Sequence, residues 1–295
     1  MADVLLATRG SALAMAQAHA VADDLTTLHP GIQVELVVVT TSGDLDRSSP
    51  VTELAELGAF VRAVQQTVLD GGADAAVHSC KDLPVRGPDG LVAVHPARLP
   101  TEDVLCGATM TGLPEGAKVG TGSPRRSAQL SLLRPDLVVT GIRGNVDSRL
   151  ARVDDGDFDA VVLAEAGLLR LGRLDAVGHR FSLDEMVPAP AQGALAVEYA
   201  VDGPAGSLLA ALDDPITRRA VLVERAVLGL TRLGCRGALG ANATPMPDGS
   251  VVLTGFVEDG VGRRRARVVS SDIDAPAALC EALGIPLEEP ALEAS

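Results

Sequence analysis

The chain has 295 residues, which is long enough for two or three domains and too long for one ordinary core. Its formal net charge of −14, from 25 Lys and Arg against 39 Asp and Glu, argues against a nucleic-acid partner, because phosphate backbones attract a basic surface. No apolar run approaches the roughly 20 residues that cross a bilayer, and the N-terminus lacks a basic leader. Four scattered cysteines without a CxxC pair indicate neither a zinc cage nor a disulfide framework. We therefore expect a cytoplasmic protein with no membrane span and no bound metal.

Helical and strand patterns alternate through the first hundred residues. Ser11 is a plausible N-cap for a helix over 11–28, in which apolar side chains recur at helical spacing. Strands are predicted over 32–39, 73–78 and 91–94, and a second helix over 54–69. This alternation indicates an α/β architecture built on a parallel sheet.

The alternation restarts near residue 104, which indicates a second α/β lobe. Its predicted strands cover 104–107, 117–120, 137–140 and 159–163, and its predicted helices cover 124–133, 146–153 and 165–171. A proline-rich stretch at 186–192 then leads to a strand over 194–197. We expect this strand to cross back to the first lobe.

The pattern changes after Asp214 and Pro215, where an N-cap followed by Pro at the first helical position predicts a helix to about Leu230. Strands are predicted near 238–244, 250–257 and 263–270, joined by ProAspGly and AspGly turn signals. The predicted fold class is α/β, with two lobes and a small C-terminal α+β domain that has an antiparallel sheet. The predicted boundaries are 1–98 with 191–212 for lobe 1, 99–190 for lobe 2, 213–288 for the C-terminal domain and 289–295 for a tail.

The segment GTGSPRR at 120–126 is the clearest candidate binding element. Ser123 is a natural N-cap, and Pro124 suits the first helical position. Arg125 and Arg126 then fall in the first turn, where the helix dipole makes cations unfavourable. Two arginines there imply a compensating anion, which the free backbone N–H groups of that turn also favour. The alternative is a pair of exposed surface arginines; a P-loop is excluded because the segment lacks its Lys and spacing.

Similar strand-to-helix junctions recur along the chain. Arg143 follows a predicted strand, Asn145 can cap the next helix, and Arg149 projects from the first turns of that helix. Arg9 and Ser11 stand at a junction of the same kind near the N-terminus. Because ligands bind at the strand ends of open α/β sheets, we expect these junctions to face one cleft and to bind several separate carboxylates.

The segment AVHSCKDLP at 76–84 ends a predicted strand with several titratable groups. His78 and Cys80 alternate as core-facing residues do, and no further ligands lie at metal spacing. Asp82 is a candidate acid or base, although a salt bridge to Lys81 or a capping role would explain it equally well.

Cys235 lies in LGCRGALG at 233–240, after a predicted helix and among glycines. A thiol in such a loop can project as a nucleophile or an attachment point. The other three cysteines, Cys80, Cys106 and Cys280, lie in apolar strands or helices and are expected to be buried and inert.

Together these segments resemble the porphobilinogen deaminase family, whose members are also called hydroxymethylbilane synthases, over essentially the whole chain. The matching segments are ATRGSALAMAQA (7–18), AVHSCKDLP (76–84), GTGSPRRSAQL (120–130), IRGNVDSRL (142–150), DAVVLAEAGLLRLG (159–172), PAPAQGALAVE (188–198) and LGCRGALG (233–240). These matches, in the same order along the chain, are too many for chance.

The resemblance implies a three-domain enzyme whose first two lobes are similar to the periplasmic binding-protein fold, with the active cleft between them. It implies a transferase of tetrapyrrole and heme biosynthesis that joins four porphobilinogen units head to tail, releases four ammonia molecules and frees a linear hydroxymethylbilane. A covalent dipyrromethane cofactor would be held by Cys235 in the C-terminal domain through a thioether. The resemblance further implies a cytoplasmic monomer with porphobilinogen as its small-molecule partner and with neither a nucleic-acid nor a membrane partner.

The resemblance also assigns roles to individual residues. Each pyrrole carries an acetate and a propionate, so the growing chain accumulates carboxylates for arginines to bind. Asp82 matches the catalytic carboxylate, which stabilises the azafulvene cation formed when porphobilinogen loses ammonia and assists proton transfer. Cofactor-binding positions fall on Cys235, Lys81, Ser123, Arg125, Arg126, Arg143 and Arg149, and substrate-binding positions fall on Arg9, Ser11, Arg170 and Gln192.

The chain departs from the family pattern at several points. It has LGAFVR at 57–62 where a basic loop is common, and ProThrGluAsp at 100–103 where AspProArgAsp is common. Gly122 and Pro124 replace Ser and Leu, and ArgGly at 236–237 follows the cysteine where an apolar residue and Pro are common. These departures concern handling of the substrate chain and loop closure.

A protein of another class is the alternative. A two-lobed anion-binding or effector-sensing protein would share the fold without catalysis. In such a protein Cys235 would be unmodified, which separates the two hypotheses.

Overall fold

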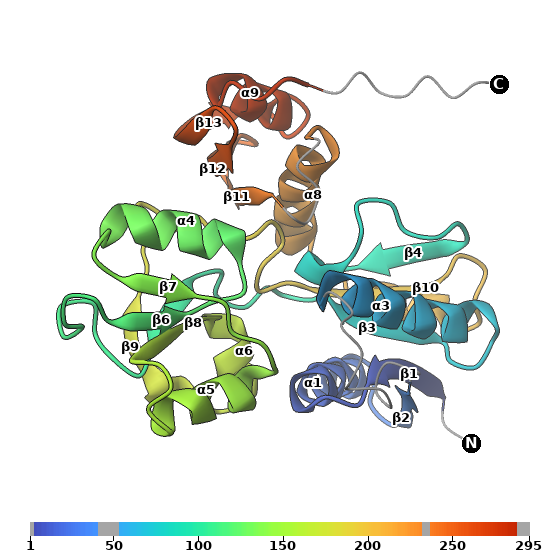
Figure 1. Cartoon of the computed structure of the whole chain (residues 1–295). Helices are drawn as coiled ribbons and strands as arrows, with labels where there is room; N and C mark the ends of the chain where they lie inside the picture. Colours follow the sequence, from blue (N-terminus) through green and yellow to red (C-terminus); the bar gives the residue numbers. More distant parts are fainter. Residues whose placement is uncertain (1–2, 41–52, 232–236, 288–295) are drawn as a thin grey trace. The chain divides into compact units, whose positions relative to one another are not determined.

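The computed structural model of the chain describes residues 3–40, 53–231 and 237–287 (Figure 1). By their contacts the residues form two compact units, one of 1–99 with 194–218 and the other of 100–193 with 219–295. The first unit contains one α/β sheet, and the second contains another α/β sheet together with a three-stranded antiparallel sheet. The division into three domains stays a prediction.

The sheet of the first unit has the strand order β2-β1-β3-β10-β4. Its strands are β1 (Val4–Arg9), β2 (Val34–Val39), β3 (Ala75–Ser79), β4 (Leu91–Val94) and β10 (Leu195–Ala200). β1 pairs in parallel with β2 and β3, whereas β10 runs antiparallel to β3 and β4. The predicted return of the 194–197 strand to the first lobe is therefore confirmed. The prediction of a parallel sheet is wrong for β10, which runs antiparallel to both of its neighbours, β3 and β4.

Helices cover both faces of this sheet. Successive side chains of a strand point to opposite faces, so a strand of consecutive apolar residues has an apolar surface to bury on each side. Leu6 points to the face that packs against α1 (Ala12–Leu28) and the short α7 (Gly206–Ala210). Its neighbour Ala7 points to the opposite face, where it packs against α3 (Glu53–Leu69). With both faces covered, the ends of the strands are where polar side chains of the sheet can meet a ligand.

The α/β sheet of the second unit repeats this plan with the order β7-β6-β8-β5-β9. Its strands are β5 (Asp103–Cys106), β6 (Lys118–Gly120), β7 (Val138–Thr140), β8 (Ala160–Ala164) and β9 (Val177–Arg180), and its helices are α4 (Pro124–Leu133), α5 (Val146–Asp154) and α6 (Glu165–Arg170). β6 is parallel to β7 and β8, and β5, again the fourth strand, is antiparallel to β8 and β9. Leu130 of α4 packs on one face, and Leu150 of α5 and Leu168 of α6 pack on the other. The short, half-polar strand β9 and the single turns η1 (Cys80–Asp82) and η2 (Leu174–Ala176) were not predicted.

The C-terminal sheet is formed by β11 (Ala238–Pro245), β12 (Val251–Asp259) and β13 (Gly262–Ser270), which are antiparallel neighbours. The predicted hairpins are confirmed, and Gly249 in the first turn takes the left-handed conformation that favours glycine (φ +89°). α8 (Pro215–Gly229) and α9 (Ala275–Ala282) share one apolar core with this sheet, and α9 was not predicted. The predicted fold class, two α/β lobes with a small C-terminal α+β domain, is confirmed.

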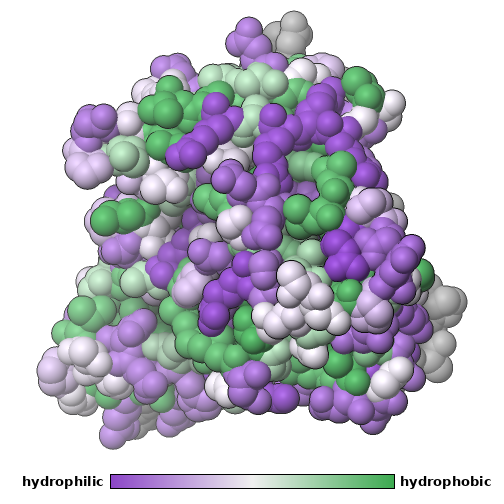
Figure 2. All heavy atoms as spheres, turned by 90° about the vertical axis from the view of Figure 1, so that its left-hand side faces the viewer, coloured by the Kyte–Doolittle hydropathy of each residue, from purple (hydrophilic) through white to green (hydrophobic). Residues whose placement is uncertain are grey.

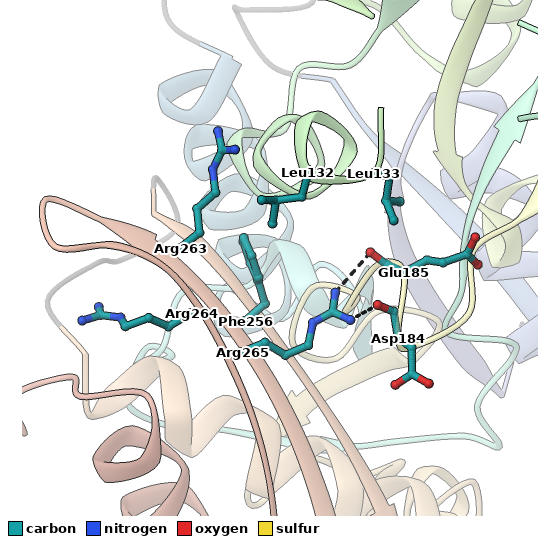
Figure 3. A pocket seen from close by; sticks show the side chains of 8 residues that line it. All are labelled: Leu132, Leu133, Asp184, Glu185, Phe256, Arg263, Arg264 and Arg265. Atoms are coloured by element: carbon teal, nitrogen blue, oxygen red, sulfur yellow. Dashed lines mark hydrogen bonds between the residues drawn. The ribbon is translucent and has the colours of Figure 1, made fainter. Parts of the chain in front are cut away.

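Within the second unit, the antiparallel sheet packs against α4 through a small core that includes Ala128 and Phe256. Beside this core lies a hollow of about 180 Å³ lined by residues of α4, β12, β13 and the 182–187 loop (Figure 3). The guanidinium group of Arg265 donates to the carbonyl groups of Asp184 and Glu185 there. Arg265 therefore ties the antiparallel sheet to the α/β sheet of the same unit.

The displayed face of the molecule carries a mixed surface. Hydrophilic and hydrophobic residues are interspersed over the face displayed in Figure 2. Strongly exposed apolar side chains such as Val261 (80%) and Ile273 (89%) belong to different segments, as is common in globular proteins. Within the described ranges, no helix combines the length and the apolar character needed to cross a bilayer.

Candidate functional site

Three predicted helix starts have the predicted side-chain caps. In each, a side-chain oxygen accepts a hydrogen bond from the backbone N–H three residues later: Ser11 from Ala14 (3.3 Å), Ser123 from Arg126 (3.4 Å) and Asn145 from Ser148 (2.9 Å). The helices follow β1, β6 and β7, and β6 lies between the parallel strands β7 and β8. The carboxyl ends of parallel neighbours meet at one edge of a sheet, so the second unit gathers the starts of α4, α5 and α6 at one edge.

Arg125 and Arg126, both less than 10% exposed, share the carboxylate of Asp103 at the start of β5. Arg125 Nη1 lies 2.6 Å from Asp103 Oδ2 and donates to the Val187 carbonyl at 2.7 Å. Arg126 Nε and Nη2 lie 2.8 and 2.7 Å from Asp103 Oδ1, and its Nη1 donates to the Val162 carbonyl at 2.9 Å. The chain itself thus supplies an anion beside this helix, and the alternative of exposed surface arginines is wrong. Binding of a ligand carboxylate by either arginine stays a prediction.

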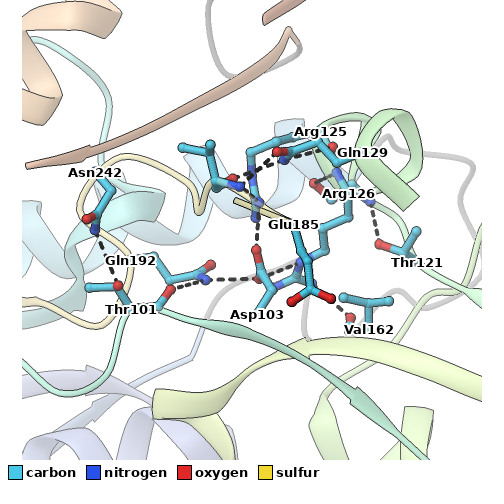
Figure 4. Close-up of polar contacts among 12 residues, drawn as sticks. Thr101, Asp103, Thr121, Arg125, Arg126, Gln129, Val162, Glu185, Gln192 and Asn242 are labelled. Carbon is cyan, nitrogen blue, oxygen red and sulfur yellow. Dashed lines mark hydrogen bonds and ion pairs between the residues drawn. The ribbon is translucent and has the colours of Figure 1, made fainter. Parts of the chain in front are cut away.

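Gln192 belongs to the same buried cluster (Figure 4). Its Nε2 donates to Asp103 Oδ1 at 2.9 Å and to the Thr101 carbonyl at 2.8 Å. Burial alone would raise the pKa of Asp103, but the charges of Arg125 and Arg126, with hydrogen bonds from Arg125 and Gln192, hold it well below its usual range. The cluster therefore keeps a permanent negative charge between two cations.

Three other predicted arginines differ in how their charge is balanced. Arg170 ends α6, donates from Nη2 to the Gly193 carbonyl at 3.0 Å, and has its pKa lowered to about 10 by burial. No ion pair joins Arg170 to a carboxylate of the described residues. Arg149 donates from Nε to the Gly144 carbonyl at 2.7 Å, and Arg143 is exposed in the loop after β7. Of the three, Arg170 is the guanidinium best suited to an anion from outside the chain.

In the first unit, the predicted residues Arg9, Ser11, Lys81 and Asp82 lie at or just after the carboxyl ends of the neighbouring parallel strands β1 and β3. The guanidinium carbon of Arg9 lies 3.9 Å from the centre of the Phe60 ring. Burial raises the pKa of Asp82, and the charges of Lys81 and Arg9 oppose that shift. A carboxyl group whose pKa is raised suits proton transfer.

His78 faces the core of the first unit, as predicted. It is 5% exposed, and burial together with the charge of Arg9 lowers its pKa to about 4, which leaves it neutral. Its Nε2 lies 3.3 Å from Glu198 Oε2, at a geometry that is not a hydrogen bond. Gln65 donates to both oxygens of Glu198 at 3.1 and 2.9 Å.

The cysteines separate into two groups. Cys80, Cys106 and Cys280 are fully buried, as predicted, and form no disulfide with one another. Burial raises the pKa of Cys106 to about 12 and also raises that of Cys280. Such thiols are poor nucleophiles. Cys235, the predicted attachment point, lies outside the described residues.

Comparison with known proteins decides the family. Residues 4–205 match the family model described as porphobilinogen deaminase, dipyromethane cofactor binding domain. A porphobilinogen deaminase of Leifsonia xyli subsp. xyli is 49% identical over 259 residues, which cover 85% of this chain and 78% of that protein. A porphobilinogen deaminase of Thermobifida fusca is 45% identical over 273 residues, which cover 90% of this chain and 81% of that protein. The chain belongs to the porphobilinogen deaminase family.

Solved structures similar to the chain include a periplasmic His/Glu/Gln/Arg/opine family-binding protein from Silicibacter pomeroyi in complex with lysine. It is 14% identical, with a TM-score of 0.38, over 71% of this chain and 88% of that one. Membership of the porphobilinogen deaminase family decides against the noncatalytic alternative.

The residues present fit the cofactor named for the porphobilinogen deaminase family. A dipyrromethane carries carboxylates on each ring, and the partly buried Arg170 has no carboxylate partner among the described residues. The described residues contain no group of three His, Cys, Asp or Glu side chains that could hold a metal ion.

The arginines of the hollow in Figure 3 do not belong to the predicted site. Arg263 pairs with Glu258 and Arg264 with Asp259, while Arg265 donates to backbone carbonyls. Each has a partner within the chain, and none was predicted to bind a ligand.

Sequence reasoning missed several buried acids. Asp103 appeared only within the departure at 100–103, yet a carboxylate that opens an apolar strand needs a buried cation. Glu198 in the strand LAVEYA gives the same signal, and both Glu198 and Glu224 in α8 are at most 5% exposed. The apolar neighbours of Asp103 and Glu198 along their strands could have indicated two of the three, whereas Glu224 lies in a helix that also contains three arginines.

Proposed function

We propose that this chain is a porphobilinogen deaminase that condenses four porphobilinogen molecules head to tail into linear hydroxymethylbilane, a transferase reaction that releases four ammonia molecules. Membership of the family supports the substrate and the reaction. The observation that carries the proposal beyond family membership is Arg170, whose charge is destabilised by burial and has no acidic partner in the described residues. A guanidinium of this kind suits the carboxylates of a pyrrole.

Arginine, lysine and hydroxyl groups bind the acetate and propionate groups in this proposal. Arg9, Ser11, Arg170 and Gln192 bind porphobilinogen. Lys81, Ser123, Arg125, Arg126, Arg143 and Arg149 hold the cofactor. Arg9 is restrained by its contact with Phe60, and Arg126 by Asp103, so both cations are oriented before a ligand arrives.

The cofactor is attached to Cys235 in this proposal. When bound, the dipyrromethane supplies the free pyrrole α-carbon at which the chain grows. Cys80, Cys106 and Cys280 are buried within the core, which supports attachment at Cys235.

Asp82 is the proposed catalytic carboxylate. The C–N bond of the porphobilinogen aminomethyl group breaks, ammonia leaves, and the resulting cation forms a C–C bond with the α-carbon of a pyrrole, which then loses its proton. The Asp82 carboxylate stabilises the positive charge that develops on the substrate and accepts hydrogen bonds from the ring nitrogens. The raised pKa of Asp82 supports this role, because a carboxylate with a raised pKa is a better proton acceptor.

The direct test is turnover of porphobilinogen by the purified protein. We expect hydroxymethylbilane to form with the release of four ammonia molecules per molecule of product. A protein that binds porphobilinogen without releasing ammonia would contradict the proposal and support an anion-sensing role instead.

We also propose that the enzyme acts in the cytoplasm as a monomer. The negative net charge of −14 supports a chain that does not self-associate. Light scattering should give the mass of one chain, 30.2 kDa plus the cofactor.

A further inference from the structure

The segment that follows the 182–187 loop has one unusual backbone conformation. Ala191 has φ +61° and is the non-glycine residue of the described chain that takes a positive φ. Its side chain is fully buried. An L-residue holds this conformation only when its surroundings impose it, and such strain collects at functional positions.

The backbone N–H of Ala191 is bound by the carboxylate of Glu224 on α8. Glu224 is fully buried, and its Oε2 accepts a hydrogen bond from the Ala191 N–H at 2.6 Å. Its other oxygen, Oε1, accepts from the Ala243 N–H on β11 at 2.7 Å. One buried carboxylate therefore holds two backbone segments together.

The residues next to Ala191 and Ala243 in the sequence both contact Thr101. The residue after Ala191 is Gln192, which donates to the Thr101 carbonyl and to Asp103. The residue before Ala243 is Asn242, which donates from Nδ2 to Thr101 Oγ1 at 3.3 Å. Glu224 thus closes a ring of contacts that passes through Thr101, entirely within the second unit.

We infer that Glu224 is a positioning residue that fixes Gln192, and through it the Asp103–Arg125–Arg126 cluster, against β11. In the sequence β11 begins three residues after Cys235. This inference rests on the proposed function, because it gives Glu224 the task of holding the ligand-binding arginines in register with the strand that follows the attachment cysteine.

The test replaces Glu224 with glutamine. Glu224→Gln keeps the shape of the side chain but offers one acceptor oxygen to two N–H donors, so one contact is lost. We expect faster hydrogen exchange at the backbone amides of Ala191 and Gln192, with the folded state retained. We expect turnover per cofactor-loaded molecule to fall about tenfold, the scale of one lost hydrogen bond between buried groups. The matched control is Glu281→Gln, at an exposed position on α9, which should change none of these readouts.

A second substitution separates positioning from a merely structural role. Glycine takes a positive φ without help, so Ala191→Gly in the Glu224→Gln background should restore turnover to within about threefold of the wild type. Restoration supports the inference. Lowered stability with unchanged turnover per loaded molecule, or no restoration by Ala191→Gly, would overturn it. If Glu224→Gln does not fold, the same measurements are made on Glu224→Asp, whose side chain is too short to bridge both amides. The same results then support or overturn the inference.

The hydrogen-exchange readout does not depend on the reaction. If the wild-type protein carries no cofactor and releases no ammonia, the proposed function fails, whatever the variants show. If the wild type is active and exchange at Ala191 is unchanged in Glu224→Gln, the inference about Glu224 fails alone.

Discussion

Gln192 donates its side-chain amide to the same carboxylate oxygen of Asp103 that accepts from Arg126 Nε, at 2.9 and 2.8 Å. This shared oxygen joins two segments that the sequence presents separately, GTGSPRR at 120–126 and PAPAQG at 188–193. A single buried carboxylate therefore decides where Arg125, Arg126 and Gln192 stand.

Removing the carboxylate of Asp103 should destabilise the folded protein. We expect Asp103→Ala to lower the free energy of unfolding by about 3–5 kcal/mol, because two buried cations would be left without their anion. The exposed pair of Arg152 and Asp157 is the control, and Asp157→Ala should change the free energy by less than about 1 kcal/mol. Urea unfolding of the three proteins measures this difference, and equal stabilities for the two variants would contradict the account of the cluster.

Arg170 should behave in the opposite way to Arg126. Burial destabilises the charge of Arg170 and no acid of the described residues offsets it, so Arg170→Met should leave the folded state as stable or make it more stable. The same variant should raise the KM for porphobilinogen, because the proposed carboxylate partner would be lost. Arg126→Met, which removes a partner of Asp103, should lower stability. A large loss of stability in Arg170→Met would show that the residue is structural.

Asp82 should be needed for turnover but not for attachment of the cofactor. Asp82→Ala should lower kcat by about 100-fold or more, the scale of a lost acid–base group, while the covalent adduct remains. In the wild type the activity that depends on the Asp82 carboxylate should fall as the pH drops through its pKa, which lies above the ordinary value of about 4. An acidic limb below that ordinary value, or normal turnover in Asp82→Ala, would remove Asp82 from the mechanism.

His78 should make the stability of the protein depend on pH. Its pKa is about 4 in the folded protein and about 6.5 when unfolded, so between these values the unfolded chain binds the proton more strongly. The stability contributed by neutral His78 is complete above pH 6.5 and is lost as the pH falls toward 4, by about 3 kcal/mol. His78→Asn should remove this part of the pH dependence, whereas the exposed His19→Asn should not. If the free energy of unfolding changes with pH in the same way in the wild type and in His78→Asn, this role of His78 is contradicted.

The sequence was most informative where local physics decides the structure. Ser11, Ser123 and Asn145 cap the helices that their residue types predicted, since a cap depends on a few neighbours along the chain. The antiparallel direction of β10 and the partner of Arg125 were not predicted, because both depend on contacts between residues far apart in the chain. Asp103 is 22 residues from Arg125, and no spacing rule links two residues so separated.

In the candidate site, too, local features were predicted and contacts between distant residues were not. The residue types at strand ends indicated a site for several carboxylates, and the structure places these residues at strand ends. It also commits Arg125 and Arg126 to an internal anion, which explains why two cations can stand at a helix start without a ligand. The reaction was indicated by the resemblance of several segments, in the same order along the chain, to the porphobilinogen deaminase family. The spacing of no single residue indicated it.

The intact mass of freshly purified protein tests the central claim most directly. The account predicts a mass above that of the bare chain by two linked pyrrole units, and the loss of this excess in Cys235→Ala. A bare-chain mass for the wild type, made in cells that supply porphobilinogen, would contradict the proposed function.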